Sequence, residues 1–308
     1  MEIRRGTRKV FSKNSIPNRA QVSARKLAIL LFAIALQSLL LVENSAARSS
    51  REAAEIPFKL YNDNLIVVKG GLGALAGVNL ILDTGTTSTV ISKSTADRLK
   101  LSGHAEVLQM LNGAVRTDSF TLSNIEIGTV SCKDFKVIVQ DLGFLQQTIG
   151  ISISGIVGLD VLSTQNLTID YRARKISFGL ISATRNKAQF ATRVPLLTVE
   201  TTIDGQAARL VLDSGTPVLM LFRNRLKRTG AMLASAPTNI VVTGAGRTQI
   251  QSYRVPVTLG EEGLGLRAIQ IADADIEPDA GFDGLLGLTA MGFRKVSFDF
   301  DAGIFSWE

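Results

Sequence analysis

Two short acidic motifs are the residues in this sequence best suited to chemistry. They are Asp83-Thr84-Gly85-Thr86 and Asp213-Ser214-Gly215-Thr216. Each follows an apolar run, residues 80–82 or 210–212, that predicts a buried strand. One such motif alone is ordinary turn chemistry, because Asp, Ser, Thr and Gly all favour turns. Two copies in equivalent settings indicate a repeat.

The spacing of later residues extends this repeat through most of the chain. Gly158 follows Asp83 by 75 residues, and Gly287 follows Asp213 by 74. Each glycine lies in an apolar Gly-x-x-Gly-Leu stretch, and each half ends in a predicted strand, turn and strand, over residues 166–178 and 295–307. Matched periodicity of this kind predicts that one all-β unit occurs twice.

The paired motifs resemble those of the aspartic proteases, over roughly residues 56–308. The single-chain plan is similar to pepsin-like enzymes, and the short halves look like the retroviral-type protease fold of two-lobed bacterial proteins. The resemblance implies an all-β fold with two homologous lobes, 56–189 and 190–308, and short helices. It also implies that Asp83 and Asp213 face each other across a cleft as the catalytic pair, and that the protein is a monomer, with a pseudo-dimer inside one chain.

Two carboxyl groups held together define a specific chemistry. They cannot both ionise cheaply, so they share a proton and titrate as a unit. The charged acid takes a proton from a bound water, while the protonated acid hydrogen-bonds to the scissile carbonyl. We therefore expect an aspartic endopeptidase that needs no cofactor and no metal.

The residues beside the acids are expected to position the pair. Gly85 and Gly215 allow close backbone approach and direct their N–H groups at the carboxylates. By the resemblance, Thr84 and Ser214 hydrogen-bond across to the opposite lobe. These four residues are expected to hold the two acids in one plane.

The outer hydroxyl residues, Thr86 and Thr216, are expected to donate to the outer carboxylate oxygens. Such bonds favour the charged form of an acid. We therefore expect an acidic working range.

One predicted hairpin per half lies where this family places a flap over the substrate, at residues 107–117 and 240–250. The candidate flap residues are Met110, Leu111, Asn112, Gly113, Thr243, Gly244, Ala245 and Gly246. Asn-Gly at the first tip is a strong tight-turn signal. The first hairpin lacks the flap tyrosine of pepsin-like enzymes, and Pro217 stands where the first half has Thr87. An extended peptide or unfolded protein is the expected partner, paired with both flaps as added strands.

The N-terminal region predicts export. Residues 1–47 hold eight Lys or Arg and two acids, which leaves 26 Lys or Arg and 25 acids in the rest. An uncharged apolar segment, residues 27–42, is 16 residues long. This length lies between a signal-peptide core of about 7 to 15 and a membrane-spanning helix of about 17 to 25. We expect a periplasmic or extracellular body, secreted after cleavage near Ala47 or anchored to the membrane by 27–42, with residues 48–55 as a linker.

Other chemistries have little support in the composition. The body after residue 47 is nearly neutral, which argues against a nucleic-acid surface. His104 is the single histidine and Cys132 the single cysteine, so a zinc site, a serine triad or an intrachain disulfide is not expected. The alternation of Asp273, Asp275, Glu277 and Asp279 resembles a calcium loop, but Pro278 stands where the turn glycine is required.

One alternative stays open. A duplicated lobe can keep its fold after losing activity, so a non-catalytic peptide-binding protein of the same fold is the second reading.

Overall fold

The computed structural model describes residues 55–101, 103–110, 113–179, 181, 184–191, 196–225, 238–243, 246–272, 276 and 280–308. Strands dominate this part of the chain and its helices are short, which confirms the prediction of a mostly β protein. The basic leader, the apolar segment 27–42 and Ala47 lie outside the described residues. Within the described ranges, no helix has the length and apolar character needed to cross a membrane.

The first half of the described chain carries eleven strands and three short helices. Its elements are β1 (Glu55–Pro57), β2 (Lys59–Tyr61), β3 (Leu65–Leu72), β4 (Leu75–Leu82), β5 (Val90–Ser92), α1 (Lys93–Leu99), β6 (His104–Met110), β7 (Gly113–Ile127), β8 (Val130–Gln140), α2 (Gly143–Ile149), β9 (Gly155–Val157), α3 (Leu159–Leu162), β10 (Leu167–Asp170) and β11 (Lys175–Phe178).

The second half repeats much of this order with fewer helices. Its elements are β12 (Asn186–Ala191), β13 (Thr198–Ile203), β14 (Gln206–Asp213), β15 (Leu219–Phe222), η3 (Arg223–Arg225), β16 (Thr238–Thr243), β17 (Gly246–Leu259), β18 (Glu262–Ala272), β19 (Gly284–Gly287), η5 (Thr289–Met291), β20 (Lys295–Asp299) and β21 (Ile304–Trp307). The expected lobe boundary between residues 189 and 190 falls inside β12, and β1 starts at Glu55, the last residue of the expected linker.

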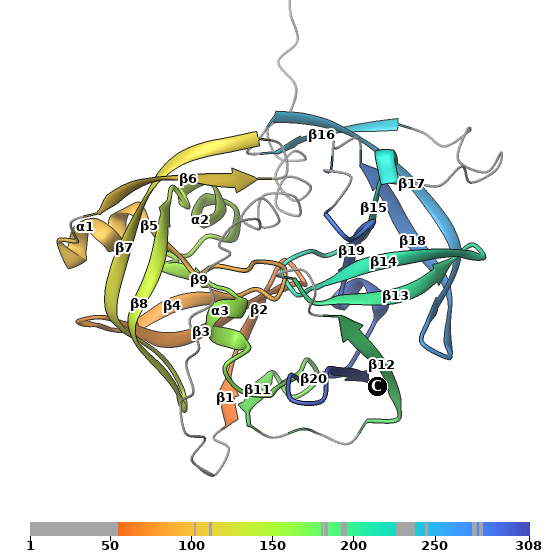
Figure 1. The fold of residues 1–308 in the computed structure, drawn as a ribbon, viewed down its shortest axis with the longest axis horizontal. Coiled ribbons are helices and arrows are strands. Elements are labelled where there is room, and N and C mark those ends of the chain that lie inside the picture. Colours follow the sequence, from red (N-terminus) through yellow and green to blue (C-terminus); the bar gives the residue numbers. More distant parts are fainter. Residues whose placement is uncertain are drawn as a thin grey trace, which may run out of the picture.

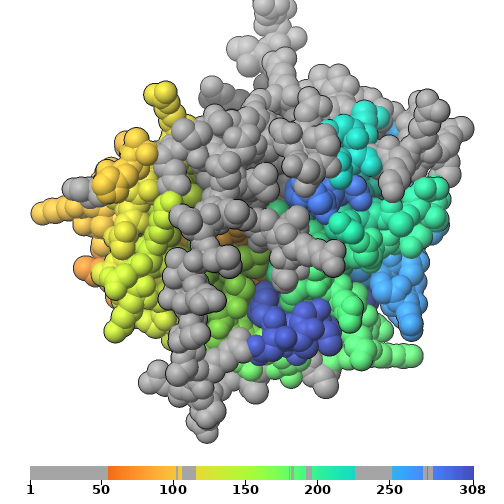
Figure 2. Space-filling model, viewed as in Figure 1, coloured from red at the N-terminus to blue at the C-terminus, as the bar shows by residue number. Residues whose placement is uncertain are grey.

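The two halves share one strand order. The first half runs β3-β4-β9-β5-β8-β7-β6 and the second runs β13-β14-β19-β15-β18-β17-β16. The parallel pairs also match, because β4 pairs with β9 as β14 pairs with β19, and β5 with β8 as β15 with β18. The halves lie side by side, the first in orange to green and the second in teal to blue (Figures 1 and 2).

The terminal hairpins join the halves instead of closing each one. Strand β10 pairs with β20 across the two halves, which gives the continuous order β1-β11-β10-β20-β21-β12 at the base of the molecule in Figure 1. Each half ends in a strand, turn and strand as predicted, β10–β11 and β20–β21, but the pairing between the two hairpins was not predicted. Both hairpins have an open edge, and pairing the two edges satisfies backbone groups that would otherwise be left without partners.

Asn166 ties this shared sheet together from the first half. Its Oδ1 accepts from the N–H of Phe300 at 2.8 Å and of Asp301 at 3.4 Å, and its Nδ2 donates to Asp301 Oδ2 at 3.0 Å. Two residues on, the buried hydroxyls of Thr168 and Ser297 lie 2.9 Å apart. The side chain of Asn166 therefore caps the turn between β20 and β21.

The early glycine cluster proves to be part of a strand. Gly70 and Gly71 lie inside β3, and the turn that follows is at Gly73 and Ala74. A Cβ on Gly70 would lie 2.6 Å from the Glu126 carbonyl oxygen and 2.6 Å from Leu80 Cδ1, so close packing at an irregular pairing requires glycine there.

The short helical segments after β5 and β15 are only partly equivalent between halves. In the first half, helix α1 follows β5, and Ser92 caps it by accepting from the Thr95 N–H at 3.2 Å. In the second half a 3-10 turn, η3, occupies the start of the corresponding segment, and residues 226–237 lie outside the described part.

Buried apolar side chains from both halves form one large core. It extends from Phe58 in the first half to Trp307 at the end of the second, and includes the central strands β4, β14 and β19. A smaller cluster in the first half includes Leu65, Ile81 and Leu145. The strands that precede the two acidic motifs are thus fixed by burial on both faces.

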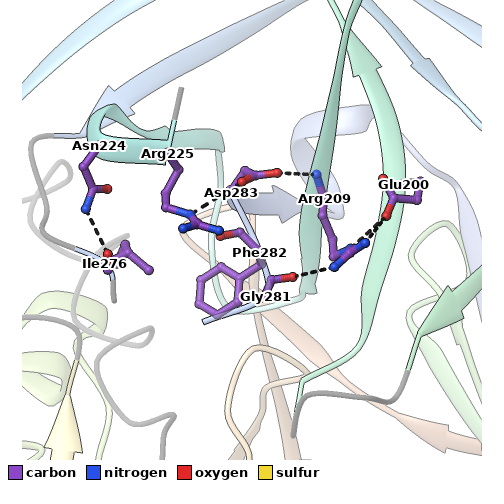
Figure 3. Close-up of polar contacts among 8 residues, drawn as sticks. All are labelled: Glu200, Arg209, Asn224, Arg225, Ile276, Gly281, Phe282 and Asp283. Carbon is purple, nitrogen blue, oxygen red and sulfur yellow. Dashed lines mark hydrogen bonds and ion pairs between the residues drawn. The ribbon is translucent and has the colours of Figure 1, made fainter. Parts of the chain in front are cut away.

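The halves differ in charge where β14 and β19 begin. Arg209 N–H donates to Asp283 Oδ2 at 2.9 Å, its guanidinium pairs with Glu200 at 2.7 Å, and Arg225 Nε lies 3.6 Å from Asp283 Oδ1 (Figure 3). In the first half the positions equivalent to Arg209 and Asp283 are Asn79 and Ser154. Both are uncharged, and the Ser154 N–H donates to the Asn79 carbonyl. This network links β13, β14 and η3 to the loop before β19.

Candidate active site

The two acids occupy equivalent positions at the ends of buried central strands. Asp83 directly follows β4 and its N–H donates to the Val157 carbonyl of β9 at 3.0 Å. Asp213 ends β14, and its carbonyl accepts from the Leu288 N–H after β19 at 3.2 Å. Each strand is held by a parallel neighbour, so each acid has a defined position at the strand end.

The glycines of the two motifs show that the acids meet. A Cβ on Gly85 would lie 2.4 Å from Asp213 Cγ, and a Cβ on Gly215 would lie 2.6 Å from Asp83 Oδ2. Each glycine thus packs against the carboxyl group of the other half. The absence of a side chain at these two positions is what lets the loops approach.

The small hydroxyl residues cross-link the two loops. Thr84 N–H donates to Ser214 Oγ at 3.0 Å, and Ser214 N–H donates to Thr84 Oγ1 at 3.0 Å. The Thr84 hydroxyl then donates to the Leu212 carbonyl at 2.8 Å, and the Ser214 hydroxyl to the Leu82 carbonyl at 3.2 Å. These buried reciprocal bonds fix the loops relative to each other.

Backbone N–H groups bind the inner oxygen of each acid. Gly85 N–H donates to Asp83 Oδ1 at 2.8 Å. Asp213 Oδ1 accepts from two groups, Gly215 N–H at 2.7 Å and Thr216 N–H at 3.0 Å. The outer oxygens, Oδ2 of both acids, are buried and have no hydrogen-bond partner among the described residues.

The outer threonines differ from expectation. The Thr86 hydroxyl donates to the Ser88 carbonyl at 3.3 Å instead of to Asp83, because a carbonyl two residues away is in reach of its short side chain. Thr216 reaches Asp213 with its backbone N–H, and its buried hydroxyl has no partner within the described part of the chain. The outer oxygens of the acids therefore stay available to another donor.

Burial raises the pKa of both acids. Loss of hydration raises the pKa of Asp83 well above its usual range, and the charge of Asp213 raises it further. Burial likewise raises the pKa of Asp213, while the Gly215 and Thr216 N–H groups oppose that rise. The pair therefore retains a proton at pH values where ordinary carboxyls have lost theirs.

A third buried acid, Asp160, was not singled out by the sequence reading. Its Oδ2 accepts from the Thr89 N–H at 2.6 Å, its Oδ1 accepts from the Thr89 hydroxyl at 2.7 Å, and that hydroxyl accepts from the Gly158 N–H at 3.1 Å. Burial raises the pKa of Asp160 to about 6, although Thr89 opposes the rise. The signal in the sequence that could have identified Asp160 was its position two residues after Gly158.

The hairpins expected as flaps are described only in part. In β6 and β7 Met110 pairs with Gly113, and in β16 and β17 Thr243 pairs with Gly246. The tip residues Leu111, Asn112, Gly244 and Ala245 lie outside the described residues. The flap assignment stays a prediction.

Other candidate positions are placed as follows. His104 lies exposed in β6, and Cys132 lies half-buried in β8, where burial raises the pKa of its thiol. All four acids of the alternation at residues 273–279 lie outside the described part. Among the residues that are described, no group of three or more His, Cys, Asp or Glu side chains is arranged to hold a metal.

Comparison with known families bears on the first half. Residues 68–161 match the family model described as aspartyl protease. The matched segment contains Asp83, its strand β4 and the Gly158 motif. A search of curated proteins finds no match. The family match supports a protease function in general. Asp83 lies inside the matched segment, and Asp213 lies beyond it.

Proposed function

We propose that the protein is an aspartic endopeptidase that hydrolyses peptide bonds with a water activated between Asp83 and Asp213. The observation that supports this most directly is the reciprocal packing, in which Gly85 touches the Asp213 carboxyl and Gly215 touches the Asp83 carboxyl. This arrangement brings two buried acids from different halves to one point. The family match over residues 68–161 agrees with it.

The proposed reaction uses the two outer oxygens. A water held between Asp83 Oδ2 and Asp213 Oδ2 loses a proton to the ionised acid as it attacks the peptide carbonyl carbon. The protonated acid donates its hydrogen bond to the carbonyl oxygen and stabilises the tetrahedral diol. The diol collapses when the leaving nitrogen takes a proton back from the pair.

The halves provide the expected setting for an extended substrate. Their shared strand order supports the inference that they are copies of one lobe, which makes the protein a pseudo-dimer within a monomer. We propose that the β6–β7 and β16–β17 hairpins pair with an extended peptide as added strands. Substrate selection would then depend on side chains that enter pockets on alternate sides.

Cleavage of a denatured, fluorescently labelled protein tests the function. The assay covers the range from about pH 3 to about pH 8, with and without a peptide carrying a statine-type transition-state mimic. We expect inhibition by the mimic and a fall of at least about a thousandfold in kcat for Asp83→Asn and for Asp213→Asn, because each removes half of the acid–base pair. Full activity in either variant would refute the proposal.

The non-catalytic alternative gives a different result in the same experiment. A peptide-binding protein would bind the statine peptide and release no fragments at any pH. Wild-type protein that binds but never cleaves would therefore replace the protease proposal with the binding one.

Export is a separate proposal that the N-terminal sequence supports. The basic leader and segment 27–42 are expected to direct the body to the periplasm or the outside of the cell, with cleavage near Ala47 or retention as an anchor. Sequencing the N-terminus of the protein recovered from cell fractions tests this. A cytoplasmic protein that starts at Met1 would contradict it.

A further inference from the structure

Asn64 is a buried polar residue outside both acidic motifs. It lies in the turn between β2 and β3 and is only 1% exposed. Asn62 and Asp63 in the same turn have φ values of 50° and 62°, which Asn and Asp tolerate better than other side chains, and the Asn64 N–H donates to the Tyr61 carbonyl at 3.2 Å. The turn is thus determined locally and presents Asn64 to the other half.

The side chain of Asn64 reaches the second acidic loop. Its Nδ2 donates to the Gly215 carbonyl oxygen at 2.5 Å. That oxygen belongs to the same peptide group as the Thr216 N–H, which donates to Asp213 Oδ1 at 3.0 Å. Because a peptide group is planar, the bond that fixes its oxygen also fixes the direction of its N–H. Donation to the carbonyl also polarises the group and strengthens the N–H as a donor.

This connection makes the two acids unequal. Asp213 accepts backbone hydrogen bonds from Gly215 and Thr216, whereas Asp83 accepts a well-formed one from Gly85. The Gly215 N–H has the smallest influence on Asp83 of the groups that affect its pKa. Donors that bind the charged form of an acid favour that form. The negative charge is therefore better stabilised on Asp213 than on Asp83.

The strand register identifies the sequence position in the second half that is equivalent to Asn64. Ile66 pairs with Leu82 in the first half, and the Leu212 N–H donates to the Leu197 carbonyl in the second. Counting back two residues from Ile66 and from Leu197 makes Pro195 the residue equivalent to Asn64. Pro195 lies outside the described residues, and a proline side chain has no hydrogen-bond donor.

Resting on the proposed function, we propose that Asn64 is a positioning residue: through the Gly215–Thr216 peptide group it makes Asp213 the ionised acid and leaves the shared proton on Asp83. In the reaction, the water proton then passes to Asp213 Oδ2. Asp83 gives its proton to the carbonyl oxygen as the diol forms. The pair thus ends this step with one proton, now on Asp213.

Among the described residues, the charge of Asp213 acts on two titratable groups. One is Asp83, whose ionisation that charge opposes. The other is Tyr171, whose buried hydroxyl has no partner among the described residues and whose pKa is raised by burial and by the charge of Asp213. Tyr171 therefore stays neutral through the working range and does not compete for the proton.

The test uses Asn64→Leu in the full chain, which keeps the side-chain volume and removes the donor. The pH dependence of kcat/KM has an acid limb that reports ionisation of the pair in the free enzyme. We expect this limb to move up by about one pH unit, which is about a tenfold fall in kcat/KM below the optimum. Near the optimum the loss is expected to be smaller. Asn64→Ala removes the same donor with less bulk, and is used if Asn64→Leu does not fold.

Asn79→Leu is the matched control. Asn79 lies in the same half, and its Nδ2 donates to the Ser152 carbonyl at 2.7 Å, away from the acids. A purely structural effect would lower the melting temperature in both variants and leave the acid limb in place. An unmoved limb in the folded Asn64 variant, or an equal shift in Asn79→Leu, would overturn the proposal.

Carboxyl-carbon NMR titration of the full chain separates this inference from the proposed function. We expect the Asp213 signal to titrate at lower pH than the Asp83 signal, and to move up in the Asn64 variant. If no cleavage is seen but this shift occurs, the protease proposal fails and the role of Asn64 stands. If Asp83 titrates first in the wild type, the role of Asn64 is wrong even in an active protease.

Discussion

At the scale of single residues, the site depends on two positions that have no side chain. Gly85 and Gly215 each lie against the carboxyl group of the other half. Neither has the left-handed backbone that usually explains glycine, since neither is among the glycines with positive φ. Space, not backbone freedom, is the constraint at both.

Gly85→Ala is expected to abolish most activity without unfolding the protein. A Cβ placed 2.4 Å from Asp213 Cγ must displace that carboxyl, and a shift of about 1 Å in a reacting group costs on the order of a hundredfold in rate. The measurement is kcat/KM with a thermal melt on the same sample. Gly263→Ala is the control, because nothing lies within 4 Å of a Cβ there, and equal losses in both variants would contradict this account.

Residue types predicted the two acids better than the residues that form hydrogen bonds around them. Asp83 and Asp213 were found because each stands in a distinctive motif that occurs twice. Asn64 was missed because Asn62-Asp63-Asn64 has the composition of any polar turn, and its long-range bond to Gly215 has no trace in the local sequence. The Thr86 hydroxyl was assigned to the wrong acceptor because hydroxyl rotation and a nearby carbonyl decide the bond.

At the scale of elements, Asp160 links the acidic loop to the strand and helix that follow. The loop residue Thr89 donates twice to Asp160 in α3 and accepts from Gly158 at the end of β9. The Thr89 hydroxyl thus joins the loop after Asp83 to the end of β9, the strand that pairs with β4, and to α3. In the second half, the residue two positions after Gly287 is Thr289, so that acid is not repeated.

Thr89→Val is expected to destabilise the first half. Valine keeps the shape but leaves the Gly158 N–H and an Asp160 oxygen without their partner, which costs on the order of 1–3 kcal/mol for each buried group. Urea unfolding of the purified protein measures the loss. Thr89→Ser restores the hydroxyl and should recover most of the stability, so an equally unstable Thr89→Ser would show that the methyl group, not the hydroxyl, matters.

Element prediction from sequence succeeded where a local signal exists. The apolar runs before each acid identified β4 and β14. The partner of a strand is not a local property, so the pairing of β10 with β20 could not be read from the terminal hairpins. The same holds for the extension of β3 through Gly70 and Gly71, where packing overrides the usual preference of glycine for turns.

At the scale of the whole molecule, the halves are one structural unit. They share the sheet that contains β10 and β20, one apolar core, and the cross-linked loops of Thr84 and Ser214. A half that lost any of these would expose apolar surface and open strand edges. We therefore expect both halves to unfold together.

Calorimetry should show one transition whose midpoint falls as pH rises from about 4 to about 7. The folded-state pKa values of Asp83, Asp213 and Asp160 are all raised, the last to about 6. Their contribution to stability is complete below the unfolded carboxyl pKa of about 4 and is lost as pH rises through the folded values.

Asp83→Asn should flatten this dependence. The amide keeps the shape and its Oδ1 can still accept from Gly85, while one of the two repelling charges is gone. The variant should be inactive and melt higher than wild type near pH 7. Two separate transitions, or the wild-type slope in the variant, would contradict this view.

The position of Asn166 has a consequence for how the protein is produced. Asn166-Leu167-Thr168 is a glycosylation sequon, yet the amide that would carry the sugar is held by Asp301, and the threonine hydroxyl that the transferase reads is buried against Ser297. A glycan added to the nascent chain would prevent the cap on the β20–β21 turn from forming. Hosts that modify secreted chains with sugars should therefore yield misassembled material, which Asn166→Gln would not cure because the longer amide cannot replace the cap.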